Sequence, residues 1–337
     1  MSWVDARERA DRWQAGHPAV SFPFAVLKKF VEDDAASLGV QVAYWGFFSV
    51  FSLLLAFVAI LGFVLRGDPS FQKQVVDSTL ERMPVIGPQI SGHFGSLPGS
   101  GVALGLGLLG AVWTGLGVTL AMSSALDRVW SVPCLHRSGF VKSRIRGLLV
   151  LASVGAINVV ATAAVGSATT GAIGPTSATV LSITAAAGVD LVVFVVSFRL
   201  LTTAAVTVRQ VLPGALLATG CWLALQALGG VYVTKVLTGS SQTYGGFAVV
   251  VGLLAWLLIA SEITLVAAEV NVVLAHELWP RSLAGSLMPA DERAMRDSVV
   301  AERRDPREQI DVTFVIPQAS SDHELRADPI EQVRNPS

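Results

Sequence analysis

Charged residues are scarce in this 337-residue chain, and cysteine is scarcer still. Asp, Glu, Lys and Arg make up 15% of the residues, whereas ordinary globular proteins carry about 25%. Cys134 lies in a predicted loop and Cys221 in an apolar run, so no disulfide is expected. Together with a hydrophobic content of 52%, this composition excludes a soluble globular protein and most classes of enzyme.

Catalytic motifs are also missing. The five histidines are scattered, and no H-E-x-x-H motif or Cys/His spacing predicts a metal site. There is no G-x-S-x-G elbow or P-loop, and the G-x-G-x-x-G match at 105–110 lies inside an apolar run without a preceding strand. A ribonuclease would need a metal–carboxylate or His/Lys site and a basic groove, which the sequence does not offer. We therefore expect no enzyme activity, cofactor, metal ion or nucleic-acid partner.

Six long apolar runs dominate the sequence. Each is long enough to cross about 30 Å of hydrocarbon as a helix that rises about 1.5 Å per residue. They lie at about 42–65, 101–123, 147–168, 176–198, 214–236 and 245–272. The predicted fold class is all-α, a polytopic membrane protein with a bundle of six transmembrane helices in a domain at 42–279.

Lys and Arg fall almost entirely on alternate sides of these runs. Of the 24 Lys and Arg residues, 20 lie in the N-terminal segment 1–41, the second and fourth loops, and the tail. Because basic residues near a helix end resist translocation, both termini are predicted on the cytoplasmic side of the cytoplasmic (inner) membrane. The first run starts too late and is too long for a cleaved signal, so the first helix itself directs insertion.

The segments outside the runs differ in character. Stretches at 20–38 and 71–90 repeat apolar residues at helical spacing and predict amphipathic interfacial helices, although each could merely cover an end of the bundle. Residues 280–337 are rich in Asp, Glu, Arg, Ser and Pro, and predict a disordered cytoplasmic tail. Its apolar patch at 312–316 could add as a strand to a cytoplasmic partner. The alternative is a passive solubilising tail.

Four segments resemble one known family. They are A-Y-W-G-F-F-S-V-F-S at 43–52, L-D-R-V-W at 126–130 with the basic loop after it, L-P-G-A at 212–215, and 244–271 with its final A-E-V-N. These are similar to segments of the YihY/BrkB family of six-helix bacterial inner-membrane proteins, over about residues 24–275. Ser52 stands where that family usually has proline, which should straighten the first helix, and Asp127 stands where Asn is common.

The resemblance implies a six-helix fold more firmly than an activity. Members of the family have been described as transporters, lipid-export factors and virulence factors, and some carried an old ribonuclease label.

Acids inside the apolar runs are the main candidates for chemistry. An ionised side chain costs several kcal/mol in the membrane and usually faces a cavity or a partner. The candidates for proton coupling or substrate binding are Asp190, Glu262, Glu269 and Asn271. Asp190 and Glu262 are expected to act as a pair. The alternative is that these groups only fix helix packing.

Two further sets of residues have predicted roles. Candidates for binding lipid headgroups are Arg137, Lys142, Arg144 and Arg146, near the start of the third run, although the same residues could simply determine topology. Gly101 and Gly105 form a G-x-x-x-G pair, and Gly107, Gly110, Gly115 and Gly117 add small residues, which predicts close packing of the second helix against a neighbour.

We interpret the chain as a transporter or flippase-like protein that moves a lipid, a lipid-linked precursor or a small solute across the cytoplasmic membrane. The expected cavity is lined by the first, fourth and sixth helices. The alternative is a non-transporting scaffold for cell-envelope proteins, which would use the 71–90 helix and the tail. Membrane lipids are the expected partners, and the sequence leaves open a homo-oligomer and a cytoplasmic partner of the tail.

Overall fold

A computed structural model describes residues 9, 11–64, 101–137, 139–169, 175–232, 238–282, 288–303, 305, 310 and 312–313. This part of the chain is helical and contains no strand. The long helices are α3 (Ala35–Val64), α6 (Gly101–Val129), α7 (Phe140–Thr169), α8 (Pro175–Leu201), α9 (Val208–Tyr232) and α10 (Thr238–Ala275). Each of the six is long and apolar enough to cross a membrane, so the predicted all-α polytopic fold is confirmed.

The helices extend beyond the apolar runs from which they were predicted. The first helix begins at Ala35 rather than 42, and the third begins at Phe140 rather than 147. Hydropathy marks the part of a helix that lies in hydrocarbon, whereas the backbone hydrogen bonds continue into polar flanks. The third helix therefore includes Lys142, Arg144 and Arg146 in its first two turns.

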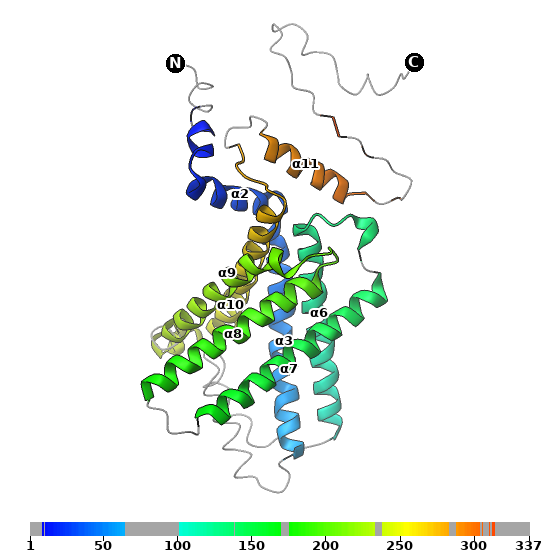
Figure 1. Cartoon of the computed structure of the whole chain (residues 1–337). Coiled ribbons are helices and arrows are strands. Elements are labelled where there is room, and N and C mark those ends of the chain that lie inside the picture. The colour runs from blue at the N-terminus through cyan, green and yellow to red at the C-terminus, as the bar shows by residue number, and fades with distance from the viewer. Residues whose placement is uncertain are drawn as a thin grey trace, which may run out of the picture.

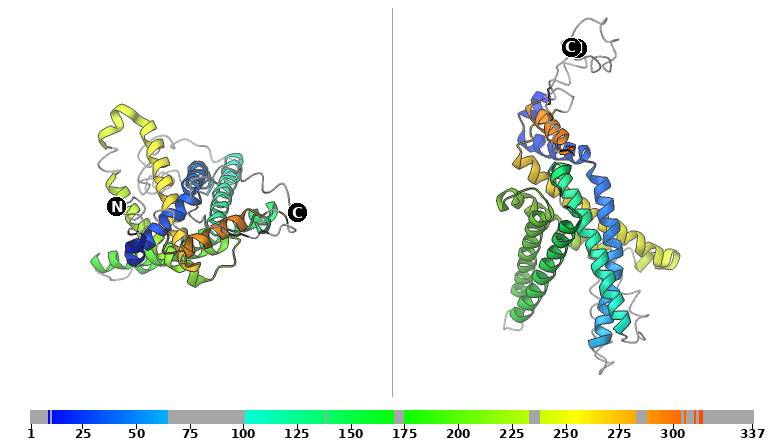
Figure 2. Two further views of the ribbon diagram at one scale, coloured as in Figure 1. Left: turned by 90° about the horizontal axis from the view of Figure 1, so that it is seen from above. Right: turned by 90° about the vertical axis from the view of Figure 1, so that its right-hand side faces the viewer.

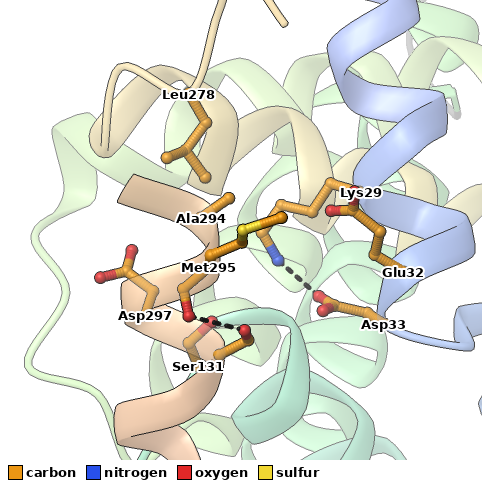
Figure 3. A pocket seen from close by; sticks show the side chains of 9 residues that line it. Lys29, Glu32, Asp33, Ser131, Leu278, Ala294, Met295 and Asp297 are labelled. Atoms are coloured by element: carbon orange, nitrogen blue, oxygen red, sulfur yellow. Dashed lines mark hydrogen bonds and ion pairs between the residues drawn. The ribbon is translucent and has the colours of Figure 1, made fainter. Parts of the chain in front are cut away.

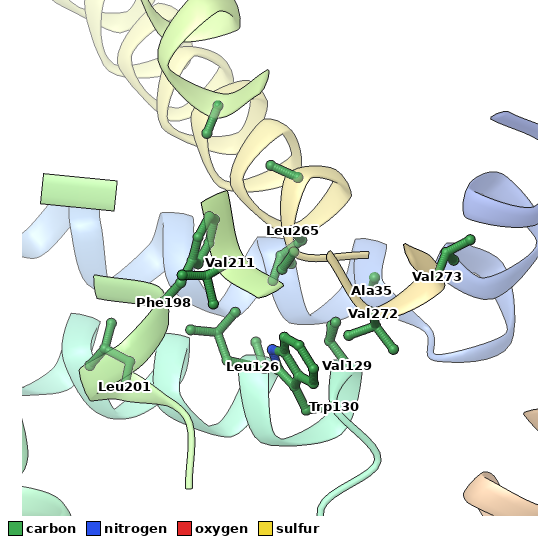
Figure 4. Close-up of a cluster of buried hydrophobic side chains, with 14 of the residues drawn as sticks. Ala35, Leu126, Val129, Trp130, Phe198, Leu201, Val211, Leu265, Val272 and Val273 are labelled. Atoms are coloured by element: carbon green, nitrogen blue, oxygen red, sulfur yellow. The ribbon is translucent and has the colours of Figure 1, made fainter. Parts of the chain in front are cut away.

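The helices meet at one end of the bundle, which we call the terminal end. There α2 (Pro18–Glu32) and α11 (Pro289–Ala301) lie across the ends of the long helices (Figure 1). Away from this end, the α7–α8 pair diverges from the α3–α6 pair (Figure 2). Buried apolar side chains gather at the terminal end and include Leu126, Trp130, Phe198, Val211 and Leu265 (Figure 4).

Away from the terminal end, large apolar side chains are exposed. Leu109 and Trp113 of α6 and Val159 of α7 are each 70% exposed. Contiguous apolar surface of this kind is unfavourable in water but suits a lipid environment. The described bundle therefore has its protein core at one end and lipid-facing surface along its length.

The interfacial helix expected at 20–38 is shorter than predicted. It ends at Glu32, because Asp34 adopts a left-handed conformation with φ 53° and the chain turns into α3 at Ala35. Asp is among the few non-glycine residues that adopt this conformation readily. The helix buries Ala25 and Val26 and exposes Val20, Leu27 and Val31, so its outward face is apolar, as suits the edge of a membrane. The second expected interfacial helix, 71–90, lies outside the described residues.

The prediction of a tail disordered from residue 280 is wrong for the segment that forms α11. Asp291, near the start of α11, is buried and hydrogen-bonded to groups of other elements. Polar composition predicts disorder because it offers little apolar surface to bury, but ion pairs with distant residues hold this helix in place. The patch at 312–316 lies mostly outside the described residues.

The glycines of α6 pack against α3, although not through the predicted pair. A Cβ on Gly107 would lie 3.0 Å from the Cα of Ala56, and one on Gly117 would overlap the ring of Trp45. A Cβ on Gly105 would meet nothing within 4 Å. The surroundings of Gly101 lie outside the described part of the structure. Close packing of this helix against α3 is therefore observed at Gly107 and Gly117 and not at Gly105.

A second close approach joins α9 to α10. Pro213 lies inside α9, where it lacks a backbone N–H. The backbone N–H of the next residue, Gly214, donates to Asn271 Oδ1 of α10 at 2.6 Å. A Cβ on Gly214 would overlap the carbonyl oxygen of Ala267. Asn271 therefore has a structural role, because it satisfies the backbone of a proline-containing helix at the point of closest contact.

Two glycine substitutions on α9 test this contact. We expect Gly214→Ala to destabilise the protein by about 1–3 kcal/mol, because the added methyl group meets backbone atoms that cannot move alone. Gly220→Ala is the matched control, since a Cβ there would meet nothing within 4 Å and alanine favours the helix. Thermal unfolding of the two variants in detergent measures the difference. Equal melting temperatures would contradict the proposed α9–α10 contact.

Candidate functional site

A buried ion pair joins α2 to α10 at the terminal end. The Nζ of Lys29 lies 3.3 Å from Oε2 of Glu269, and the two side chains are 4% and 0% exposed. Lys29 also pairs with Asp33, four residues further along the chain. Its Nζ donates to the carbonyl oxygen of Val129, at the end of α6, at 2.8 Å. One ammonium group therefore connects α2, α6 and α10.

The carboxylate of Glu269 is unusually poor in hydrogen bonds. Within the described part of the chain, neither of its oxygens has a hydrogen-bond partner, although Oε2 lies within ion-pair distance of Lys29. Transfer of two charges out of water costs several kcal/mol per ion, and the attraction between them offsets that cost only with good geometry and further hydrogen bonds. The environment of Glu269 therefore favours a change of protonation or partner.

The ammonium group of Lys29 is better held. Burial lowers its pKa, but the nearby carboxylates of Glu269 and Asp33 outweigh burial, so the pKa of Lys29 is raised above its usual value. Lys29 therefore keeps its charge at neutral pH. The pair is asymmetric, with a firmly charged lysine and a weakly solvated acid.

A pocket lies beside Lys29, between α2 and α11 (Figure 3). Its volume is about 260 Å³. Lys29 and Glu32 of α2 and Asp33 of the following turn form one wall, and four residues of α11 form another. The lining also includes Ser131 and Leu278. Because Lys29 and Asp33 line it, the pocket connects the polar groups around Glu269 with the surface.

A second ion-pair cluster lies next to the first. Arg281, which is 1% exposed, donates from Nη1 and Nη2 to the two carboxylate oxygens of Glu32 at 2.7 and 2.9 Å. Its Nε donates to Asp291 at 2.9 Å. Burial acts to raise the pKa of Asp291, but hydrogen bonds from Lys28, Ser282 and Arg281 lower it overall. This cluster holds α11 against α2.

The structure does not bring Asp190 and Glu262 together. Asp190 is half-buried on α8, which packs mainly on α7 and α9. Glu262 lies beside Gly39 of α3, with its Cγ 3.4 Å from the position of a Cβ there. Neither acid has an ion pair or hydrogen bond within the described residues. The buried pair in the structure is therefore Lys29 with Glu269, not Asp190 with Glu262. Of Lys29 and Glu269, only Glu269 was among the predicted candidates.

Lys29 was missed because it lies in a segment that looks solvated. A signal was nevertheless present: Lys29 follows Ala25 and Val26 by four and three residues, which places it on the same helix face as these buried residues. Its partner on α10 is 240 residues away in sequence, and no local pattern predicts that contact.

The predicted basic cluster divides into residues with different roles. Arg146 donates to Thr203 Oγ1 at 3.1 Å, and that threonine donates to Asp127 Oδ2 at 2.8 Å, which ties α7 to α6 and the α8–α9 loop. Arg144 stacks on the ring of Phe140, 3.4 Å from its centroid. Arg137 donates to the carbonyl oxygen of Val132 at 3.3 Å. Lys142 is exposed near the start of α7.

A double-mutant cycle measures the coupling of the central pair. Lys29→Met alone should destabilise the protein by about 3–5 kcal/mol, because it leaves Glu269 buried without a cation. Adding Glu269→Gln should recover much of that loss, because no buried charge then remains. Denaturation in detergent gives the free energies, and the exposed Lys142→Met is the control. Additive effects of the two substitutions would show that the groups do not interact.

Comparison with known proteins identifies the family. Neither a curated protein nor a solved structure matches the chain. A family model described as "Virulence factor BrkB" matches residues 26–286. The match includes both members of the buried pair, Lys29 and Glu269, and all six long helices, and it ends before α11. The chain therefore belongs to the BrkB virulence-factor family of membrane proteins.

Proposed function

We propose that this protein is a carrier that moves a lipid, a lipid-linked precursor or a small solute across the cytoplasmic membrane. The observation that carries the proposal is the buried Lys29–Glu269 pair, whose acid lacks hydrogen bonds and whose lysine lines a pocket. Ionisable groups at such positions usually serve transport or proton transfer. A scaffold needs neither the pair nor the pocket.

The proposed mechanism converts a proton into a change of helix contacts. With Glu269 ionised, Lys29 holds α2 against α10 and α6 through Glu269 and the carbonyl oxygen of Val129. When Glu269 accepts a proton, the ammonium group loses that counter-ion and keeps Asp33, which lies on its own side of the contact. The attachment of α2 to α10 then weakens. A carrier needs such a step, in which a bound ion shifts the balance between two arrangements.

The side of the membrane follows from the charge distribution. The terminal end carries the basic α6–α7 and α8–α9 loops together with α2 and α11, so we place it in the cytoplasm by the positive-inside rule. The pocket beside Lys29 then opens to the cytoplasm, and Lys142 lies at the level of the inner-leaflet headgroups. Anionic lipids attract each such basic residue by about 1 kcal/mol.

Transport can be measured with a fluorescent lipid in proteoliposomes. Wild-type protein should make inner-leaflet NBD-phosphatidylglycerol accessible to external dithionite, whereas Lys29→Met/Glu269→Gln should not. The double variant is used because it leaves no buried unpaired charge and is expected to fold. Gly220→Ala, whose added methyl group would meet nothing within 4 Å, should keep most of the activity.

The same vesicles, loaded with pyranine, report proton entry under a potassium diffusion potential. This second assay tests the carrier proposal in the case that the cargo is not a phospholipid. Wild-type vesicles that resemble protein-free vesicles in both assays would contradict the carrier proposal and favour a scaffold.

Topology is tested by fusions at the C-terminus. A green fluorescent protein fusion should fluoresce in cells and an alkaline phosphatase fusion should be inactive, because the first folds in the cytoplasm and the second requires the periplasm. The reverse pattern would place the pocket on the outer face.

A further inference from the structure

Helix α11 lies over the terminal end, between α2 and the α6–α7 loop (Figures 1 and 2). Near its start, Asp291 bonds to residues of α2 and of the segment after α10. Just beyond its end, the carbonyl oxygen of Arg303 accepts a hydrogen bond of 3.1 Å from the backbone N–H of Leu135, in the loop between α6 and α7. The helix is thus attached at both ends and passes over the space between.

The first half of α11 is held firmly. Asp291, whose side chain is 6% exposed, accepts hydrogen bonds from Lys28 Nζ at 2.8 Å, Arg281 Nε at 2.9 Å and the backbone N–H of Ser282 at 2.9 Å. Its neighbour Ala290 is 1% exposed. Charge-assisted hydrogen bonds between buried groups are the strong kind, so this end is a fixed point.

The second half is held weakly. Asp297 pairs with His276 at 3.0 Å, and both side chains are more than a third exposed. Arg293, between Asp291 and the second half, lies 3.7 Å from Glu277, whose side chain is 82% exposed. Exposed ion pairs contribute little to stability. Beyond them, the carbonyl oxygen of Arg303 accepts the hydrogen bond from Leu135.

The weakly held half lies over the pocket beside Lys29 (Figure 3). Ala294, Met295, Asp297 and Ser298 form its α11 wall, while Lys29 and Asp33 lie opposite. A lifting of these residues about Asp291 would uncover Lys29 and Asp33. It would separate Ala294 from the buried cluster but leave the hydrogen bonds of Asp291 intact. Because the family match ends at residue 286, this cover lies outside the matched region.

We propose that α11 is a hinged strap that pivots at Asp291 and opens and closes access from the terminal side to the pocket at Lys29 and Asp33. The gating role rests on the proposed function, because it matters only if Lys29 and Glu269 take part in transport. The movement itself does not depend on transport and can be measured separately.

The test is the rate at which a thiol in the pocket is labelled. Ser131→Cys is introduced into the full chain carrying Cys134→Ser and Cys221→Ser, purified in detergent, and treated with methyl methanethiosulfonate, a small uncharged reagent whose approach does not depend on the charges around the thiol. Loosening the strap with Arg293→Ala/Asp297→Ala should accelerate labelling by about 2- to 30-fold, the range expected for loss of two exposed ion pairs. Lys142→Cys, which is exposed and lies on α7, is the matched control, and its labelling rate should not change.

Salt provides a second measurement that needs no strap substitution. Raising ionic strength from about 0.1 to 1 M shortens the screening length from about 10 to 3 Å, and should accelerate labelling of Ser131→Cys but not of Lys142→Cys. This measurement decides the matter if the loosened variant does not fold.

Labelling at an unchanged rate in high salt would overturn the strap proposal. Labelling that responds as expected, in a protein that moves neither lipid nor protons, would support the strap and count against the carrier function instead.

Discussion

Burial of the Lys29 ammonium group is the constraint on which the terminal end of this protein depends. A buried charge without a partner is strongly destabilising, so the groups around Lys29 have to be in place together. Glu269 supplies the opposite charge from α10, Asp33 supplies another from the turn before α3, and Val129 supplies a carbonyl oxygen from the end of α6. The same requirement fixes α2 across the end of the bundle, and α2 in turn provides Lys28 and Glu32 to hold α11. A loss of charge at Glu269 therefore affects several helices at once.

Most of the fold follows from hydropathy alone, because each membrane-spanning helix needs about 20 apolar residues and satisfies its own backbone. The ends of the helices cannot be predicted from hydropathy. The apolar run of α7 starts at about 147, whereas the helix itself begins at Phe140. The close contacts also depend on tertiary structure. Gly105 and Gly107 are indistinguishable in sequence, yet Gly107 alone of the two meets α3. The α11 helix escaped prediction because its stability comes from Asp291 and its distant donors rather than from its own composition.

The candidate site was predicted in part. Glu269 was among the candidates predicted from the apolar runs, but Asp190 and Glu262 were the two acids expected to act as a pair. The position of an acid within its run does not reveal what lies opposite. Glu269 faces a lysine on an interfacial helix, whereas Asp190 faces no charged partner in the described part of the chain. The burial of Lys29 could have been suspected from its position on the face of Ala25 and Val26, although its partner could not.

The central claim is that Glu269 changes its protonation while Lys29 stays charged. Infrared difference spectroscopy of the purified protein between two pH values measures this directly, with Glu269→Gln as the reference. The account predicts a carboxylic-acid C=O band that grows as the pH falls, is absent from Glu269→Gln and is shifted by Lys29→Met. A spectrum without a titrating band that depends on Glu269, across the pH range in which the protein stays folded, would mean that the pair is fixed and would contradict the proposed coupling.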